Sequence, residues 1–422
     1  MRGAAPGRLG ELARLFLKLG VIAFGGPAAH IAMLEDEVVT RRKWIDRQHF
    51  LDLIGATNLI PGPNSTEMTM HVGYERAGWA GLVTAGACFI LPAVLITSVF
   101  AWLYVTYGAL PAVEPFLYGI KPAVIAVIIG AIWRLGRPAV KDWRHGVLGA
   151  AVAVVLLVGL GEIPGLLIGG LIGMFWFRAA RDDGAGTAER YVPILFLQSG
   201  PVGGADVDSV VTGTAGGPGI AGGAGILGAT GAAAGATAGA AVGGAAGVSL
   251  GKVFLFFLKI GSVLYGSGYV LIAFLEGGLV ADYAWLTQGE LLDAVAIGQF
   301  TPGPVLSTAT FIGYLLDGVP GAAVATVGIF LPSFFFVLLL NPLIPRLRSS
   351  VWMAAFLDAV NVTALALMVA VTIELGIGVL TSWPAWLMAL GAGAMVVRFR
   401  TNAVWLVLGG AIVGRVLWGW AG

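Results

Sequence analysis

Two short segments of this sequence combine a broken backbone with polar side chains. Residues 61–63 and 302–304 both read Pro-Gly-Pro, and each triplet lies inside an otherwise apolar stretch. Proline lacks an N–H group and clashes with the preceding helical turn, so each triplet interrupts a helix. A helix that restarts after such a break directs unpaired N–H groups and its positive dipole end into the protein, which is an arrangement that binds anions.

Polar side chains around both breaks supply further hydrogen-bond donors. We therefore predict a substrate site for an anion, with Asn58, Pro61, Gly62, Pro63, Asn64, Ser65 and Thr66 at the first break and Gln299, Thr301, Gly303, Ser307 and Thr308 at the second. Asn64 and Glu67 also have the spacing of a capping box at the start of the new helix. The alternative is a purely structural kink, in which these polar groups cap their own backbone.

Two lysines occupy matching places within apolar stretches. Lys18 precedes the glycine-rich turn at Gly25 and Gly26, and Lys259 precedes a similar turn at residues 265–268. A lysine inside a membrane is costly and usually has a partner or a ligand. Both lysines and the two glycines are therefore candidate substrate-binding residues, and the alternative is that the lysines extend to the membrane surface.

Four titratable residues are candidates for moving protons. Glu67 and His71 are one helical turn apart beside the first break, and Asp52 and Asp293 match each other in the two halves. A carboxylate disfavours a dianion nearby, so we expect the aspartates to relay protons or to pair with the lysines rather than to bind the anion. Glu67 and His71 are a candidate pair for proton coupling, with a structural hydrogen bond as the alternative. The four histidines lack metal-site spacing and the chain has a single cysteine, so we predict no metal and no cofactor.

The bulk composition indicates a membrane protein. Of the 422 residues, 58% are hydrophobic and 11% are charged, whereas an average soluble domain has about a quarter charged residues. Such sparse charge suits a surface in contact with the lipid bilayer. The net charge of +1 gives no basic field for nucleic acid. No nucleotide-binding loop, nucleophile elbow or zinc helix is present, so we do not expect an enzyme.

A duplication organises the chain. Residues 16–20 return at 257–261, and the first Pro-Gly-Pro returns at the same offset, since 302 − 61 = 241. We predict an all-α integral membrane protein with two homologous repeats of about six hydrophobic segments each, at residues 1–178 and 251–422. The Gly/Ala-rich linker at residues 179–250 is expected to be a flexible tether, with an additional membrane crossing as the alternative.

Basic residues predict how the repeats are oriented. Arg134, Arg137, Lys141 and Arg144 follow the fourth apolar segment of the first repeat, whereas Arg346 and Arg348 follow the third segment of the second. Positive charges concentrate on the cytoplasmic side of a membrane, so the repeats are expected to be inverted, with broken or re-entrant helices at the Pro-Gly-Pro triplets.

Several long motifs resemble those of the chromate ion transporter family, in its long-chain, two-domain form. They cover residues 16–20, 24–30, 41–44 and 61–63 in the first half and residues 292–299, 301–304, 308–314, 325–334, 341–345 and 356–361 in the second. The resemblance extends over nearly all of both halves and excludes the linker.

This resemblance implies a multi-pass secondary transporter of the inner (plasma) membrane. It implies export of chromate, driven by the proton-motive force or by anion exchange, and resistance to chromate; it allows a homodimer. Chromate and sulfate are both tetrahedral dianions, so a carrier of sulfate or another oxyanion is the alternative. A membrane-embedded enzyme or assembly subunit is a more remote alternative.

Overall fold

The computed structural model describes residues 6–24, 26–182, 248–266, 268–340, 350–399 and 401–418. Most of the predicted linker therefore lies outside the described residues. The described part of the chain consists of helices joined by turns and loops, with no strand among the described residues. The first repeat contains α1 (Pro6–Ile22), α2 (Pro27–Glu35), the π-helix η1 (Asp36–Arg41), α3 (Arg47–Thr57), α4 (Asn64–Tyr107), α5 (Glu114–Ala139), α6 (Trp143–Leu157) and α7 (Glu162–Asp182).

The second repeat follows the same order. It contains α8 (Leu250–Val263), the short 3-10 helix η5 (Gly268–Val270), α9 (Leu271–Leu275), the π-helix η6 (Glu276–Asp282), α10 (Gln288–Phe300), η7 (Val305–Ser307), α11 (Thr308–Leu340), α13 (Val351–Val379), α14 (Trp383–Phe399) and α15 (Ala403–Leu417). Both Pro-Gly-Pro triplets interrupt the helical path as predicted, one between α3 and α4 and the other between α10 and η7.

The repeats share local backbone geometry as well as sequence. Lys43 and Ala284, which differ by 284 − 43 = 241, both have a φ of 50°. Gly78 of α4 has a φ of 62° and Gly318 of α11 has a φ of 56°. A positive φ is uncommon for residues other than glycine. Its recurrence at matched positions confirms that the two halves are structural repeats.

The positive φ at Gly78 and Gly318 marks a sharp reversal inside the longest helices. Gly73 lies against the backbone oxygen of Gly81, eight positions along the chain, and Gly313 lies against Gly321 in the same way. In a straight helix these glycines would be about 12 Å apart. Each of α4 and α11 is therefore a short arm folded back on a long arm, with glycines at the crossing so that the backbones can approach closely.

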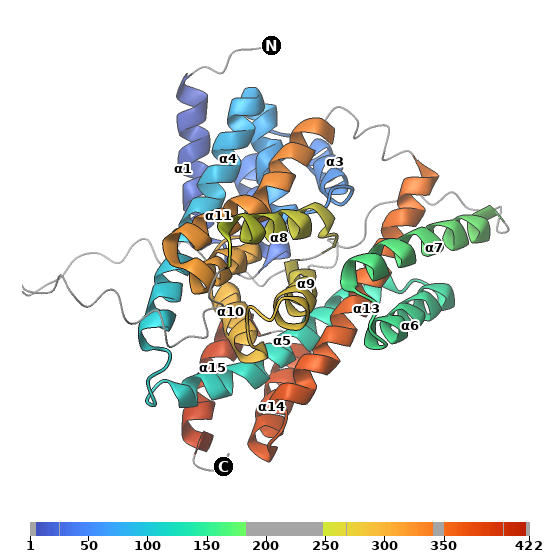
Figure 1. Ribbon diagram of the computed structural model, residues 1–422. Helices are drawn as coiled ribbons and strands as arrows, with labels where there is room; N and C mark the ends of the chain where they lie inside the picture. Colours follow the sequence, from blue (N-terminus) through green and yellow to red (C-terminus); the bar gives the residue numbers. More distant parts are fainter. Residues whose placement is uncertain are drawn as a thin grey trace, which may run out of the picture.

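The helices form two packed groups. In the first group α1 packs on α4, α8 packs on α11, and the two folded helices pack on each other. In the second group the repeats exchange partners: α7 and α6 of the first repeat pack on α13, whereas α15 and α14 of the second pack on α5. Figure 1 shows the two groups one above the other, with α9 and α10 between them. This exchange ties the repeats into one molecule.

The long arms of α4 and α11 run in opposite directions. In Figure 1 the end of α4 reaches the lower left of the molecule, whereas the end of α11 lies at the top. Equivalent helices that cross a bilayer in opposite directions define an inverted repeat. Arg346 and Arg348, on which the charge-based prediction depends, lie outside the described residues.

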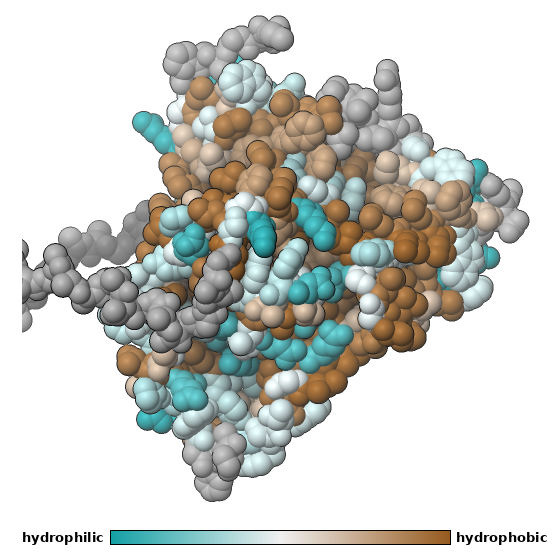
Figure 2. Space-filling model, viewed as in Figure 1, coloured by the Kyte–Doolittle hydropathy of each residue, from teal (hydrophilic) through white to brown (hydrophobic). Residues whose placement is uncertain are grey.

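Much of the outer surface is apolar, as lipid contact requires. Leu95 is 58% exposed on α4, and Phe335 is 58% exposed on α11. Figure 2 shows hydrophobic side chains over large areas, with hydrophilic ones gathered across the middle of this face. Among the described residues, five helices are long and apolar enough to cross a membrane: Asn64–Tyr107, Glu114–Ala139, Glu162–Ala179, Val305–Leu339 and Val351–Val379.

The two repeats are packed unequally. Core residues of α1, α2, η1 and α3, such as Phe16 and Phe50, form a hydrophobic cluster of their own with part of α4. The matching segment α8–α10 instead shares one cluster with α5, α13 and their neighbours. In addition, α10 packs on α5 and α15. The segment α8–α10 is thus packed against the second group of helices, whereas its counterpart α1–α3 is not. We call the side of the molecule that contains α8–α10 the closed side.

Candidate functional site

The first break is held by side chains on both of its sides. Asn58 directly follows α3, and its side-chain oxygen accepts a hydrogen bond of 2.7 Å from the side-chain amide of Asn64, which begins α4. Gly62 between them has a φ of 143°. Pro63 is the residue before α4 and no side chain caps the helix there. The predicted capping box is therefore wrong: Asn64 bonds across the break, and Glu67 interacts with Ser333.

The second break has a similar backbone with different side-chain bonds. Gly303 has a φ of 92°. The Thr301 hydroxyl donates to the Ile297 carbonyl at 2.8 Å, and the Thr308 hydroxyl donates to the Val305 carbonyl, also at 2.8 Å. These two predicted ligands thus bond their own backbone, which is the alternative that the sequence left open. The short helix η7 between them packs on α4 of the first repeat.

Reciprocal hydrogen bonds dock each break onto the other repeat. The N–H of Gly62 donates to the Leu264 carbonyl at 2.7 Å, and the N–H of Gly303 donates to the Ala23 carbonyl at 2.8 Å. The donors differ by 303 − 62 = 241 positions and the acceptors by 264 − 23 = 241. Because the same bond forms twice with the repeats exchanged, the two breaks are related by an approximate twofold axis, and each lies at the interface of the repeats.

Two buried hydroxyls beside the breaks lack a hydrogen-bond partner among the described residues. They belong to Thr66 and Ser307, which are fully buried and equivalent, since 307 − 66 = 241. By contrast, the Ser65 hydroxyl lies 3.3 Å from Nδ1 of His30. A buried polar group without a partner is costly. Thr66 and Ser307 are therefore the side chains best prepared to bind a ligand, together with the side-chain amide of Gln299, whose nitrogen is also buried without a partner.

Glu67 places a carboxyl group directly at the first break. It is fully buried on the first turn of α4, and a side chain at Gly62 would collide with its carboxyl and with the Ser333 hydroxyl of α11. Tyr265 of the second repeat is close enough to interact electrostatically with it. His71, one turn further along α4, is also buried. The predicted pair of titratable groups thus lies inside the protein beside the break.

The glycine-rich turns adjoin the same interface. Gly26 has a φ of 84°, and a side chain there would lie 3.9 Å from the Tyr269 hydroxyl of the other repeat. Gly268 lies beside the second break, where a side chain would be 3.4 Å from Val305. Gly25 lies outside the described residues. The two turns therefore lie next to the breaks, and each contacts residues of the candidate site.

The lysines lie on the outer sides of their helices. Lys18 has a side chain that is 53% exposed and donates a hydrogen bond of 2.8 Å to Glu37, a carboxylate that Arg42 also contacts. Lys259 is exposed on α8. The structure thus gives the partly exposed Lys18 a buried acidic partner and does not bring either lysine to the breaks.

The matched aspartates occupy different surroundings. Asp52 is partly exposed and accepts a hydrogen bond from Gln48 at 3.3 Å. Asp293 is 3% exposed and accepts a hydrogen bond of 2.9 Å from the Tyr104 hydroxyl of the first repeat. Lys121 of α5 also acts on Asp293. Only Asp293 is in the protein interior, because α10 is packed on α5 and its counterpart α3 is not.

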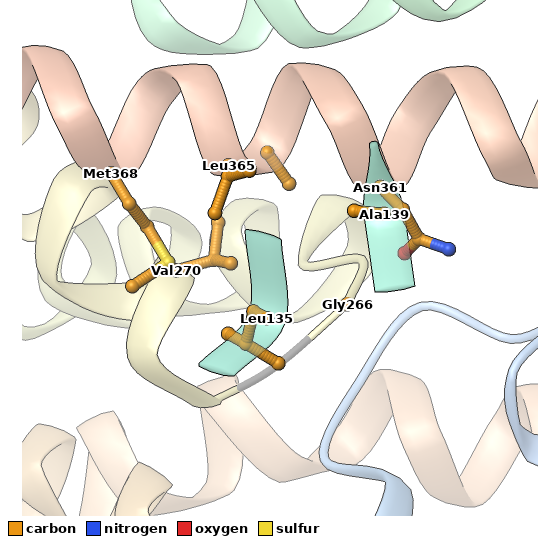
Figure 3. Close-up of a pocket in the computed structure, with 8 residues that line it drawn as sticks. Leu135, Ala139, Gly266, Val270, Asn361, Leu365 and Met368 are labelled. Carbon is orange, nitrogen blue, oxygen red and sulfur yellow. The ribbon is translucent and has the colours of Figure 1, made fainter. Parts of the chain in front are cut away.

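Tyr104 and Lys121 are functional candidates that the sequence reasoning missed. Both stand in apolar spans, where a polar side chain needs a partner, and this signal could have identified them. The same reasoning applies to Asn361, which is equivalent to Lys121 because the offset between the repeats falls by one residue after the breaks and 361 − 121 = 240. Asn361 lines a small cavity beside Gly266 (Figure 3) whose other walls are apolar, formed by Leu135, Ala139, Val270, Ala364, Leu365 and Met368.

A multi-pass helical protein with two repeats and broken helices at matching positions has the architecture of a secondary transporter. Comparison with known proteins agrees with this class. The sequence model of the family described as "Chromate transporter" matches residues 10–174 and 251–415. The chain belongs to this family.

Relatives match one or both repeats. A "Chromate transport protein" of Cupriavidus metallidurans is 28% identical over 97% of this chain and 93% of its own length. A protein with the same description from Pseudomonas aeruginosa is 30% identical over 86% of this chain and 80% of its own length. An uncharacterized transporter of Bacillus subtilis is 30% identical over 37% of this chain and 81% of its own length, so most of that protein corresponds to a single repeat. No solved structure matches the chain.

Proposed function

We propose that this protein is a secondary transporter that exports chromate from the cytoplasm and thereby confers resistance, and that the oxyanion binds at the interface of the repeats, between the two breaks. The observation that carries the proposal is the reciprocal docking of Gly62 and Gly303 next to the buried hydroxyls of Thr66 and Ser307, which have no hydrogen-bond partner in the described part of the chain. Two relatives that cover most of the chain carry the description of chromate transport proteins.

The donors at the site suit an ion that must be released again. Backbone N–H groups at the start of α4 and neutral hydroxyls bind a tetrahedral dianion from several directions without forming a tight ion pair. Both described lysines of the sequence prediction are outside this site. Neutral donors separate chromate from sulfate poorly, because the two dianions share shape and charge. A carrier of sulfate or another oxyanion therefore stays the second candidate function.

The direction of transport is proposed from the orientation of the protein in the membrane and from the membrane potential. The basic residues between α5 and α6, including Arg137 and Arg144, favour a cytoplasmic position for that loop. The inside-negative potential of a bacterial inner membrane favours outward movement of a dianion. Export driven by the proton-motive force, or by exchange against another anion, is consistent with both points.

Flux measurements in everted membrane vesicles test the proposal. Export from the cell corresponds to accumulation in such vesicles, so we expect radiolabelled chromate to accumulate and an uncoupler to abolish the accumulation. Vesicles without the protein provide the baseline. Accumulation of labelled sulfate, with no effect of excess chromate on it, would instead assign the second candidate function. No protein-dependent flux of either ion would reject both functions.

A further inference from the structure

A carboxyl group stands within the proposed anion site. Glu67 follows Thr66 directly, and its side chain is fully buried against Gly62 of the break and Ser333 of α11. Any ion bound by the first turn of α4 and by the Thr66 hydroxyl is therefore a near neighbour of this carboxyl group. A negative carboxylate there would oppose a dianion, and both groups are shielded from water, which would otherwise weaken the repulsion.

No positive charge of the described residues compensates Glu67. Its interaction partner is the Ser333 hydroxyl. The titratable groups around it are the phenol of Tyr265 from the second repeat, His71 on the next turn of α4, and His30 of α2, which contacts Ser65. Of the charged groups on the packed helices, Lys18 of α1 is bonded to Glu37, Asp52 of α3 is partly exposed, and Asp317 stands at the reversal of α11.

We propose that Glu67 takes up a proton when the oxyanion binds and releases it when the oxyanion leaves, so that proton and dianion move in the same direction. The inference rests on the proposed function and specifies its coupling. The proton neutralises the carboxylate, which removes the repulsion and turns the group into a hydrogen-bond donor for the anion. One proton and one dianion that leave the cell together carry a net charge of −1 outward.

One proton per cycle follows from the difference between the repeats. The residue equivalent to Glu67 is Thr308, since 308 − 67 = 241, and its hydroxyl is bonded to the Val305 carbonyl. The second break therefore contributes no carboxyl group. Coupling of this sign is the opposite of proton antiport, in which binding of the proton and of the anion would exclude each other.

Proton uptake on binding tests the inference with purified protein. The protein is titrated with chromate at a series of pH values from neutral to alkaline, where chromate becomes the dianion, in weak buffer with a pH indicator; sulfate serves as a second probe that stays a dianion throughout. We expect proton uptake to approach one proton per bound ion at pH values above the range in which free Glu67 titrates, and to fall below one at lower pH. Binding should weaken about tenfold for each pH unit above the range in which free Glu67 titrates.

Variants assign the proton to Glu67. Glu67→Gln should still bind chromate, with no proton uptake and with an affinity that does not change with pH, whereas Glu67→Asp should restore uptake. Glu75→Gln is the matched control, because Glu75 lies on the same helix with its side chain 40% exposed, and it should behave like the parent.

The outcomes separate this inference from the proposed function. If the parent protein binds neither chromate nor sulfate, the proposed function fails. If it binds them without proton uptake, or if Glu67→Gln takes up the proton as the parent does, the function stands and the assignment to Glu67 is wrong.

Discussion

Gly62 holds a backbone conformation that a side chain would oppose. Its φ of 143° falls in the region that favours glycine. A methyl group at this position would also occupy the space of the Glu67 carboxyl and the Ser333 hydroxyl. The residue therefore serves both the geometry of the break and the placing of a titratable group.

Gly62→Ala should damage the site more than the fold. Backbone strain of about 1–3 kcal/mol and displacement of Glu67 should abolish most chromate flux and lower the unfolding midpoint in detergent. Gly146→Ala is the control, because a methyl group there would be 4.0 Å from Val140; it should change neither quantity. Parent-like flux in Gly62→Ala would show that the break does not shape the binding site.

The helix breaks at the Pro-Gly-Pro triplets could be predicted from sequence because proline acts locally, through its missing N–H group and its ring. The hydrogen-bond partners of the neighbouring side chains could not be predicted. Asn64 bonds Asn58, and Thr308 bonds the backbone, whereas the equivalent hydroxyls of Thr66 and Ser307 have no described partner. These differences depend on how each break docks on the other repeat, and local sequence does not carry that information.

At the scale of elements, the duplication in the sequence predicted the matching order of helices and the two breaks. It did not predict that α4 and α11 fold back on themselves, because glycine within a helix usually costs stability without reversing the chain. It also did not predict that α6 and α7 of the first repeat pack on α13 of the second, or that α14 and α15 of the second pack on α5 of the first. Apolar helices of similar composition carry little information about which partner they choose.

The Tyr104–Asp293 hydrogen bond joins α4 to α10 on the closed side of the molecule. Tyr104→Phe removes the donor and leaves a buried carboxylate less well satisfied, at a cost of about 1–3 kcal/mol. We expect a thermal unfolding midpoint lower by a few degrees. Tyr107→Phe changes a residue that is 47% exposed on the same helix and should leave the midpoint unchanged. Equal midpoints for both variants would mean that this bond does not hold the closed side.

At the scale of the whole molecule, unequal packing of similar repeats is what alternating access requires. The segment α8–α10 is packed against α5, and the equivalent α1–α3 segment keeps a separate core. Exchange of these two arrangements would close one side of the paired breaks and open the other. In such an exchange, the equivalent positions Asp52 and Asp293 would swap surroundings: the partly exposed aspartate would become buried and hydrogen-bonded, and the buried one would become exposed.

The charge carried in each cycle predicts how transport responds to voltage. One net negative charge moving outward gains about 2.3 kcal/mol per 100 mV, which corresponds to roughly a 50-fold concentration ratio of chromate. Proteoliposomes with a potassium gradient and valinomycin, at equal pH on both sides, provide the measurement. A dianion moving alone would give a much steeper dependence on voltage, and electroneutral exchange would give none.

We propose that both breaks bind the same oxyanion. Isothermal titration of the purified protein with chromate measures this, in the parent and in Thr66→Val, Ser307→Ala and the control Thr363→Val, whose buried hydroxyl is bonded to its own helix at 2.9 Å. We expect one ion per chain, an affinity about ten- to a hundredfold weaker in each of the first two variants, and no change in the control. Two ions per chain, or parent-like affinity in both Thr66→Val and Ser307→Ala, would show that the breaks do not share one ion.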